Sequence, residues 1–380
     1  MKLLVSNILI PCLLLGLTFS PDYRPRVREW GLKIGVLEPG PLNAITDVAG
    51  VKVGHKTLIQ GQNIRTGVTA IIPHKGNVFQ EKVPAAVYVA NGYGKLTGST
   101  QIEELGYLET PIILTNTLSV PVAAEAVIDY VLSLPGNENV FSVNPVVGET
   151  NDGWLNDIRA RVISRRDVLE AIQKASSGPV EEGAVGAGTG TTCFSFKGGI
   201  GTSSRRLPPS LGGYTIGVLV QTNFGGILQI KGLQVERWLK KQADSSSINL
   251  TRQENGSCMI IVATDAPLDA RNLKRLAKRA LLGIARTGGY YANGSGDYAI
   301  AFSTSPSVRH RSGEKSITQQ IEVLKNEFMS PLFQAAAEAA EEAILNSLFK
   351  ATRMTGRNGH TAEPLPLDKL KPWLEKIKDE

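Results

Sequence analysis

The sequence predicts a layered α/β protein, with sheets inside and helices outside. Short apolar runs alternate with turn residues over 33–90, which is typical of strands and hairpins. Apolar residues recur at helical spacing over 121–134, 168–175, 268–286 and 331–349. Because both kinds of element are spread along the whole chain, a layered fold is favoured over separate all-α and all-β units.

Further strands are predicted where an apolar run is bounded by small or polar residues. These later strands are 140–147, 214–221, 257–263 and 298–303. The stretch 236–256 is the most polar of the interior, and it predicts an exposed, mobile loop. The sequence contains no internal repeat and no linker-like segment, so we expect one domain.

The composition is that of an ordinary soluble globular protein, with 380 residues, 42% hydrophobic and 20% charged. The formal net charge is +6, and the densest basic run lies on the helix predicted over 268–286. No aromatic residue interrupts that run, so it indicates a solvated helix face, and we expect no nucleic-acid partner. The basic residues of the run are Lys274, Arg275, Lys278, Arg279 and Arg286.

The first residues indicate export. Lys2 is followed by a short apolar stretch that reaches Leu17, which is typical of a secretory signal. The stretch is too short and too interrupted to predict a membrane span with the usual length. We therefore interpret 1–22 as a signal peptide, with an uncleaved anchor as the alternative, and 23–380 as one domain of a periplasmic or extracellular protein.

The cysteines and histidines do not form a metal-binding pattern. Beyond the leader only Cys193 and Cys258 remain, and the four histidines are scattered. Two cysteines neither make a disulfide framework nor supply a zinc site. The sequence therefore predicts an activity that uses no metal and no other cofactor.

The dipeptide Gly256-Ser257 joins the polar stretch to a predicted buried strand. If the Ser257 hydroxyl attacks the preceding carbonyl, an N-to-O acyl shift and hydrolysis leave Ser257 as a new N-terminus. A free α-amine has a pKa of about 7.7–8.0, so it can serve as the base for its own hydroxyl without a histidine. The alternative is that Asn255-Gly256 is only a turn, or part of a glycosylation sequon, and the dipeptide alone favours this alternative.

Four further positions carry side chains suited to amide hydrolysis. Ser295 and Asp297 are two residues apart, so in extended backbone they point the same way and can orient a hydroxyl or relay a proton. Asn223, at the end of a strand, can donate its amide N–H to an oxyanion. Glu149, at another strand end, can hold a substrate ammonium group. On spacing alone, a turn or a solvated loop is the commoner role for each of these residues.

The glycine-rich stretch 183–190 does not predict a nucleotide site. It lacks a preceding apolar strand and a following helix, and its glycine spacing matches neither common nucleotide-binding fingerprint. A closely packed backbone segment is expected instead.

A series of segments is more specific as an ordered set than any one of them is alone. The segments are 43–55, 109–118, 146–153, 186–190, 196–202, 217–225 (ending Thr-Asn-Phe-Gly), 256–268, 294–297 (Gly-Ser-Gly-Asp) and 355–360 (Thr-Gly-Arg-Asn-Gly-His). In this order they resemble the DmpA family of L-aminopeptidase/D-esterases and β-aminopeptidases, over about 30–365.

The resemblance implies an αββα sandwich like that of N-terminal-nucleophile hydrolases but differently connected. It also implies a self-processing serine aminopeptidase or amidohydrolase, cleaved into an α chain that ends at Gly256 and a β chain of residues 257–380. Ser257 would be the nucleophile and, through its amine, a base. Members act on short peptides, amino-acid amides or esters, assemble as homo-oligomers that are often tetramers, and use no metal.

The same resemblance implies roles for the other site residues. Ser295 and Asp297 would assist proton transfer and hold the nucleophile, although members of the family tend to have Glu at the position of Asp297. Asn223 would serve the oxyanion hole. The free amine of the substrate would face Glu149, and the pocket walls would include Asn151 and Trp154.

Two other functions remain open from the sequence. One is hydrolysis of other linear amides, as by the nylon-oligomer hydrolases, or acyl transfer, as by the ornithine acetyltransferases. The transferases usually have Thr as nucleophile and need no leader, so Ser257 and residues 1–20 argue against that version. The other is an exported, catalytically silent protein that keeps the fold, which predicts an uncleaved chain.

Overall fold

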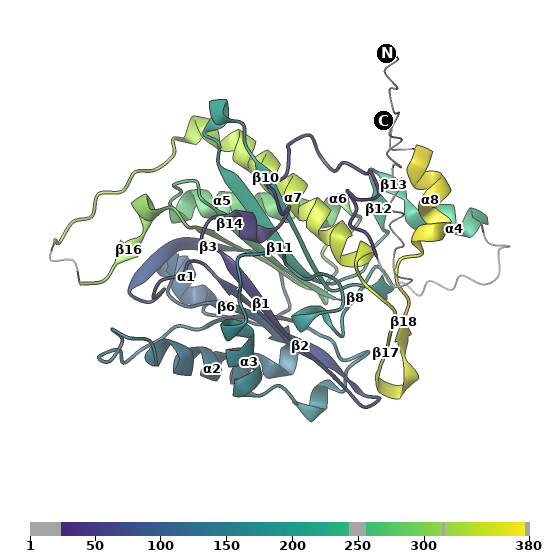
Figure 1. Ribbon diagram of the computed structural model, residues 1–380, viewed down its shortest axis with the longest axis horizontal. Coiled ribbons are helices and arrows are strands. Elements are labelled where there is room, and N and C mark those ends of the chain that lie inside the picture. The colour runs from purple at the N-terminus through teal and green to yellow at the C-terminus, as the bar shows by residue number, and fades with distance from the viewer. Residues whose placement is uncertain (1–23, 243–255, 314–315, 377–380) are drawn as a thin grey trace, which may run out of the picture.

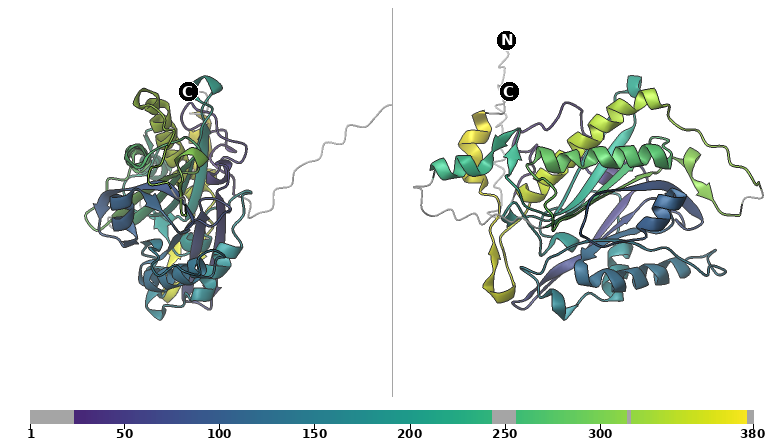
Figure 2. Two further views of the ribbon diagram at one scale, coloured as in Figure 1. Left: turned by 90° about the vertical axis from the view of Figure 1, so that its left-hand side faces the viewer. Right: turned by 180° about the vertical axis from the view of Figure 1, so that it is seen from behind.

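The computed structural model describes residues 24–242, 256–313 and 316–376. Two sheets lie face to face, and helices cover the outer face of each sheet (Figure 1). The view from behind shows the same order of helix, sheet, sheet and helix (Figure 2). The predicted αββα sandwich is therefore confirmed. The leader, 1–22, lies outside the described residues.

The first sheet has five strands, and its β6–β7 pair is parallel whereas its other pairs are antiparallel. In spatial order the strands are β1 (Lys52–Gln60), β2 (Ile64–Ile72), β6 (Ile112–Asn116), β7 (Val146–Thr150) and β4 (Leu96–Thr97). Its outer face is covered by α2 (Val120–Leu132) and α3 (Arg165–Gln173).

The second sheet has seven strands, and β14 and β15 at its centre are parallel. In spatial order its strands are β10 (Ile200–Arg206), β11 (Thr215–Asn223), β14 (Ser257–Thr264), β15 (Gly296–Ser303), β3 (Glu81–Gly92) and β16 (His310–Arg311), with β5 (Tyr107–Leu108) also paired to β3. Its outer face is covered by α5 (Ala270–Ala280), α6 (Leu282–Arg286) and α7 (Met329–Phe349).

Smaller elements surround the two sheets. The helices among them are α1 (Ser99–Leu105), α4 (Val235–Gln242) and α8 (Leu367–Lys376). The two-stranded ribbons are β8 (Thr192–Cys193) with β9 (Phe196–Lys197), β12 (Gln229–Ile230) with β13 (Leu233–Gln234), and β17 (Met354–Thr355) with β18 (Thr361–Ala362).

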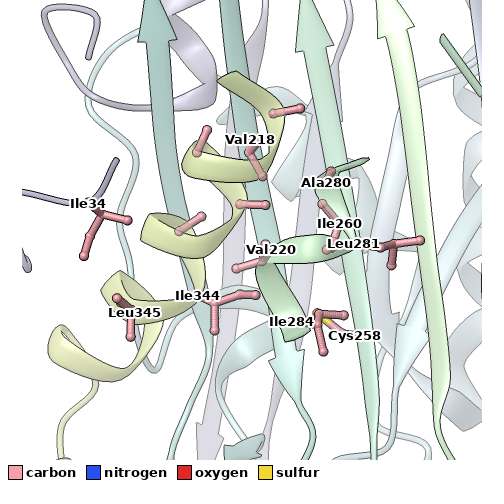
Figure 3. Packing of buried hydrophobic residues seen from close by; sticks show 14 of the residues in the cluster. Ile34, Val218, Val220, Cys258, Ile260, Ala280, Leu281, Ile284, Ile344 and Leu345 are labelled. Carbon is pink, nitrogen blue, oxygen red and sulfur yellow. The ribbon is translucent and has the colours of Figure 1, made fainter. Parts of the chain in front are cut away.

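Strand β14 has apolar cores on both of its faces. Met259 and Ile261 point into the core between the sheets, whereas Cys258 and Ile260 point toward α6 and α7 (Figure 3). A strand covered on both faces reads as a continuous apolar run, which is why 257–263 was recognisable from the sequence. Ser257 is therefore the first residue of a strand that is buried on both faces.

The structure corrects three predicted elements, which are a strand, a helix and a loop. The strand expected over 140–147 is instead β7, which starts at Val146 because its partner β6 offers only five residues for pairing. The helix expected over 268–286 is split into α5 and α6 near Leu281. In α6, Gly283 lies against α7, where an added Cβ would be 2.7 Å from the Ala340 carbonyl carbon.

The prediction of a loop over 236–256 is wrong at its start, which forms α4. Val235 and Leu239 are buried there, and the Trp238 ring stacks on Trp373 of α8 with ring centroids 6.1 Å apart. The burial of one face stabilises a helix whose composition is mostly polar. Residues 243–255 lie outside the described residues.

The basic face of α5 is occupied by intramolecular contacts. Lys274 pairs with Glu103, and Arg279 lies over the Phe333 ring at 4.1 Å from its centroid. The Lys278 ammonium lies 5.6 Å from the Tyr88 ring centroid. The prediction of a solvated helix face is therefore refined, because these side chains pack on neighbouring rings and carboxylates. Among the helices of the described residues, none has the length and apolar character needed to span a bilayer.

Candidate active site

Three adjacent strand ends meet at one edge of the seven-stranded sheet. Asn223 is the last residue of β11, and it is paired with Ser257, the first residue of β14. On its other side Ser257 is paired with Gly296, the first residue of β15. The strand register therefore places the predicted nucleophile directly between the predicted oxyanion donor and the segment that carries Ser295 and Asp297.

A cavity of about 460 Å³ opens at these strand ends. The predicted site residues among its lining residues are Glu149, Asn151, Trp154, Asn223, Gly256 and Ser257. The other lining residues, to which the sequence assigned no role, are Tyr93, Lys95, Thr117, Thr192, Asn293 and Gly294. Residues from distant parts of the chain are thus gathered around one space.

One backbone N–H group contacts both residues of the Gly256–Ser257 pair. The Gly296 N–H donates to the Gly256 carbonyl oxygen at 3.1 Å and lies 3.3 Å from the Ser257 Oγ. A side chain at position 256 does not fit, because its Cβ would lie 2.0 Å from the Asn223 carbonyl oxygen. The glycine before the serine is therefore required by close packing against β11.

The side-chain amide of Asn223 is fixed at both ends. Its Nδ2 donates to the Asn151 carbonyl at 2.9 Å, and its Oδ1 accepts from the Thr192 N–H at 3.1 Å. An amide NH₂ carries two hydrogens, so the Asn151 bond orients the second one as well. The amide faces the cavity that Ser257 also lines.

Glu149 lies at the end of β7 and is 2% exposed. One of its carboxylate oxygens accepts from the Lys95 N–H at 2.9 Å, and the other accepts from the Thr117 hydroxyl. An ionised carboxylate has about four acceptor sites. These two bonds therefore fix the carboxylate and leave it able to accept from a cation in the cavity.

Ser295 and Asp297 are buried beside the cavity and do not line it. Asp297 is paired with Cys258, whose thiol packs toward the helices, so its side chain lies on the helix-facing side of β15. Within the described residues, neither Ser295 Oγ nor the Asp297 carboxylate oxygens make a hydrogen bond of normal geometry. Burial raises the pKa of Asp297 to about 6, and the nearby Ser295 hydroxyl and Cys258 N–H partly offset this rise.

Asn91 is a residue of the site that sequence reasoning missed. The dipeptide Asn91-Gly92 resembles a turn in the sequence, but it forms the end of β3. The Asn91 Nδ2 donates to the carbonyl oxygens of Ala292 at 3.0 Å, Asn293 at 3.2 Å and Ser295 at 2.5 Å. A β-bulge between Asp297 and Tyr298 follows on the paired strand. No local sequence signal announces these contacts, because they join residues about two hundred positions apart.

The glycine-rich segment packs closely against the five-stranded sheet, as predicted. An added Cβ at Gly186 would lie 2.5 Å from the Thr69 Oγ1, and one at Gly190 would lie 2.0 Å from the Arg65 carbonyl oxygen. Cys193 and Cys258 are both buried free thiols. In the part of the chain that the structure describes, no group of three or more His, Cys, Asp or Glu side chains is arranged to hold a metal ion.

The model of peptidase family S58 matches residues 43–362. The chain belongs to peptidase family S58. This result confirms the family resemblance recognised from the ordered segments, and the segments that carry the strand ends and the cavity all lie within the matched range.

Individual relatives agree with this assignment. The chain is 41% identical over 373 residues to the β-peptidyl aminopeptidase BapA of Sphingosinicella microcystinivorans, covering 93% of each chain. Its fold is similar to that of a Burkholderia sp. β-aminopeptidase, with a TM-score of 0.85, 40% identity, and coverage of 93% of this chain and 99% of the other.

A further solved structure is the L-aminopeptidase D-Ala-esterase/amidase of Ochrobactrum anthropi, described as a prototype for the serine aminopeptidases and a new variant of the Ntn hydrolase fold. The TM-score is 0.84 and the identity is 36%, with coverage of 93% of this chain and 99% of the other. The layered arrangement found here is therefore that variant of the Ntn hydrolase fold.

Proposed function

We propose that the chain is a serine aminopeptidase that cleaves its own Gly256–Ser257 bond and then uses Ser257 as nucleophile. The observation that carries the proposal is the position of this bond. It lies at a cavity, between the fixed amide of Asn223 and the Gly296 N–H that donates to the Gly256 carbonyl. The similarity to β-peptidyl and L-aminopeptidases supports the same activity.

Self-processing would begin with attack by the Ser257 Oγ on the Gly256 carbonyl carbon. The Gly296 N–H already contacts that carbonyl oxygen and can stabilise the negative charge that develops on it. Collapse breaks the peptide C–N bond and leaves an ester, and the former amide nitrogen takes up the proton from the hydroxyl to become an amine. Water then hydrolyses the ester, which gives an α chain ending at Gly256 and a β chain beginning at Ser257.

Turnover would use the new amine as the base. The amine takes the Ser257 hydroxyl proton as Oγ attacks the substrate carbonyl, and it returns the proton to the leaving amine. The Asn223 Nδ2 donates to the oxyanion, and Glu149 holds the free ammonium group of the substrate. Ser295 and Asp297 hold the amine and support the proton transfer from the helix side of β15. Water finally releases the acyl group from Ser257.

The cavity of about 460 Å³ suits a short peptide, an amino-acid amide or an ester, with Asn151 and Trp154 forming one wall. We also propose export of the protein by its leader, and assembly as a homo-oligomer of αβ units. Hydrolysis of other linear amides is the second candidate. The buried Glu149 supports the aminopeptidase, because the ammonium group of a substrate would stabilise a buried carboxylate at the cavity.

The test is denaturing electrophoresis of the purified protein with N-terminal sequencing of each band. We expect a second N-terminus that reads Ser-Cys-Met-Ile, together with hydrolysis of aminoacyl p-nitroanilides. Ser257→Ala should stay uncleaved and inactive, whereas the matched control Cys258→Ala should be processed, because the thiol faces the helices. If the purified wild-type protein is a single uncleaved chain and still hydrolyses these substrates, the proposal is wrong.

A further inference from the structure

The ribbon formed by β17 and β18 makes hydrogen bonds to the loop that forms one wall of the cavity. Three consecutive carbonyl oxygens of that loop accept hydrogen bonds from two ribbon residues. The Arg357 Nη1 donates to Gly153 at 3.2 Å, and the Arg357 N–H donates to Leu155 at 2.7 Å. Between them, His360 Nδ1 lies 2.8 Å from the Trp154 carbonyl. Because a carbonyl only accepts, this His360 nitrogen carries the proton.

The His360 ring also stacks on the indole of Trp154. The ring centroids are 5.1 Å apart and the planes are inclined by 16°. Trp154 lines the cavity but is 46% exposed, so the walls of the fold alone do not confine it. The hydrogen bond to the Trp154 backbone holds the His360 ring in place, and the stacked ring favours the indole position that faces it.

The ribbon is built to approach this loop closely. An added Cβ at Gly356 would lie 2.0 Å from the Leu155 carbonyl oxygen, so only glycine fits there. Asn358 has a left-handed backbone with φ of 57°, which tightens the turn between the two strands. Leu155 packs against Met354 and Ala362 at the base of the ribbon. The contact is therefore a packed interface and not a chance approach of a surface loop.

The same loop is tied to the reacting groups at its other end. The Asn151 carbonyl accepts from the Asn223 Nδ2, three residues before Trp154. A shift of the loop at Trp154 would thus change the width of the cavity that Asn223 and Ser257 also line.

We propose that His360 and Arg357 are positioning residues that fix Trp154 and thereby set which size of N-terminal residue the enzyme accepts. The expected effect on substrates rests on the proposed aminopeptidase function, whereas the contact between His360 and Trp154 does not. The stacking of His360 on Trp154 is measurable whether or not the protein is active.

The first measurement is the ratio of kcat/KM for alanyl and phenylalanyl p-nitroanilides. His360→Ala should change this ratio about tenfold, because a hydrogen bond and a ring contact to the wall are lost together. His360→Phe keeps a ring and should change this ratio less. This variant also provides the test if His360→Ala folds poorly. The matched control is Arg353→Ala, since the exposed Arg353–Glu363 ion pair flanks the same ribbon.

The second measurement is tryptophan fluorescence. His360→Ala should shift the emission, because the indole loses its stacked partner, and the shift should be absent when Trp154→Phe is the background. An unchanged ratio and an unchanged emission in folded His360→Ala would overturn the inference. If the wild-type protein hydrolyses neither substrate, the aminopeptidase proposal fails, and the emission shift still decides whether His360 holds Trp154.

Discussion

The seven-stranded and five-stranded sheets both end at the cavity, but they bring different groups to it. Asn223, Ser257 and Gly296 begin or end three hydrogen-bonded strands of the seven-stranded sheet, so their backbone positions are fixed by register. Trp154 and Asn151 lie in a loop beyond β7 of the five-stranded sheet, and their positions depend on side-chain contacts. The first group forms a reacting edge held rigid by backbone pairing, and the second forms a binding edge held in place by side-chain contacts; both names refer to the proposed roles.

Gly256→Ala is expected to have the largest effect, because it acts on the rigid edge at the cleavage bond itself. Its Cβ would lie 2.0 Å from the Asn223 carbonyl oxygen and 2.5 Å from the Phe224 Cα. The strand ends must separate, so we expect no processing and a loss of activity of about 10⁶-fold, as when a nucleophile is lost. Electrophoresis and aminopeptidase assays measure both.

The control is Gly178→Ala, where no atom lies within 4 Å of the added Cβ. This variant should be processed and active. Processing of Gly256→Ala at the wild-type rate would show that the reacting edge is not rigid, and it would remove the contrast between the two sheets.

Asn223→Ala is expected to act on kcat. Loss of an oxyanion donor typically lowers kcat by about 10²–10³-fold, and KM should change little because the donor acts mainly in the transition state. Asn223→Asp should lose at least as much, since a carboxylate repels the oxyanion. A rise in KM with unchanged kcat would instead assign Asn223 to the binding edge.

Glu149→Gln is expected to act on substrate recognition. A hydrogen bond to a charged group contributes about 1.5–3 kcal/mol, so kcat/KM for substrates with a free amine should fall about 10- to 100-fold. N-acetylated substrates should not be affected, and self-processing should continue, because Glu149 belongs to the other sheet. The exposed Glu125, which pairs with Arg165, provides the control Glu125→Gln. If Glu149→Gln does not cleave itself, the reacting edge depends on the binding edge, and the two do not act separately.

The smallest expected effect concerns Asp297 and the pH dependence of stability. Its pKa is raised from 3.8 to about 6 in the folded protein, so the folded state binds more protons than the unfolded state between these values. The contribution of Asp297 to the free energy of unfolding therefore falls as pH rises from about 4 to 6, by an amount on the order of 2–3 kcal/mol.

Asp297→Asn should lose this dependence. Compared with the wild type, the variant should gain relative stability as pH rises through that window, as measured by denaturant unfolding at each pH. If the variant instead gains stability relative to the wild type as the pH is lowered, the ionised carboxylate is stabilised in the fold, contrary to its burial.

The sequence by itself determined the layered fold and the family, and it singled out the candidates for the reacting edge. β14 is recognisable because burial on both faces leaves an unbroken apolar run. The close packing that requires Gly256 was visible only in the structure. Spacing alone favoured a turn or loop role for Asn223, Ser295 and Asp297. The ordered set of family segments made them candidates for the site together with Ser257.

Only the tertiary structure decided how these candidates are held. Asn91 binds three carbonyl oxygens of the Ser295 loop, Lys95 fixes Glu149 through its backbone N–H, and His360 stacks on Trp154. Backbone groups have no sequence signature, because every residue except proline carries the same N–H and C=O. Contacts of this kind, between segments far apart in the chain, form only when the chain has folded.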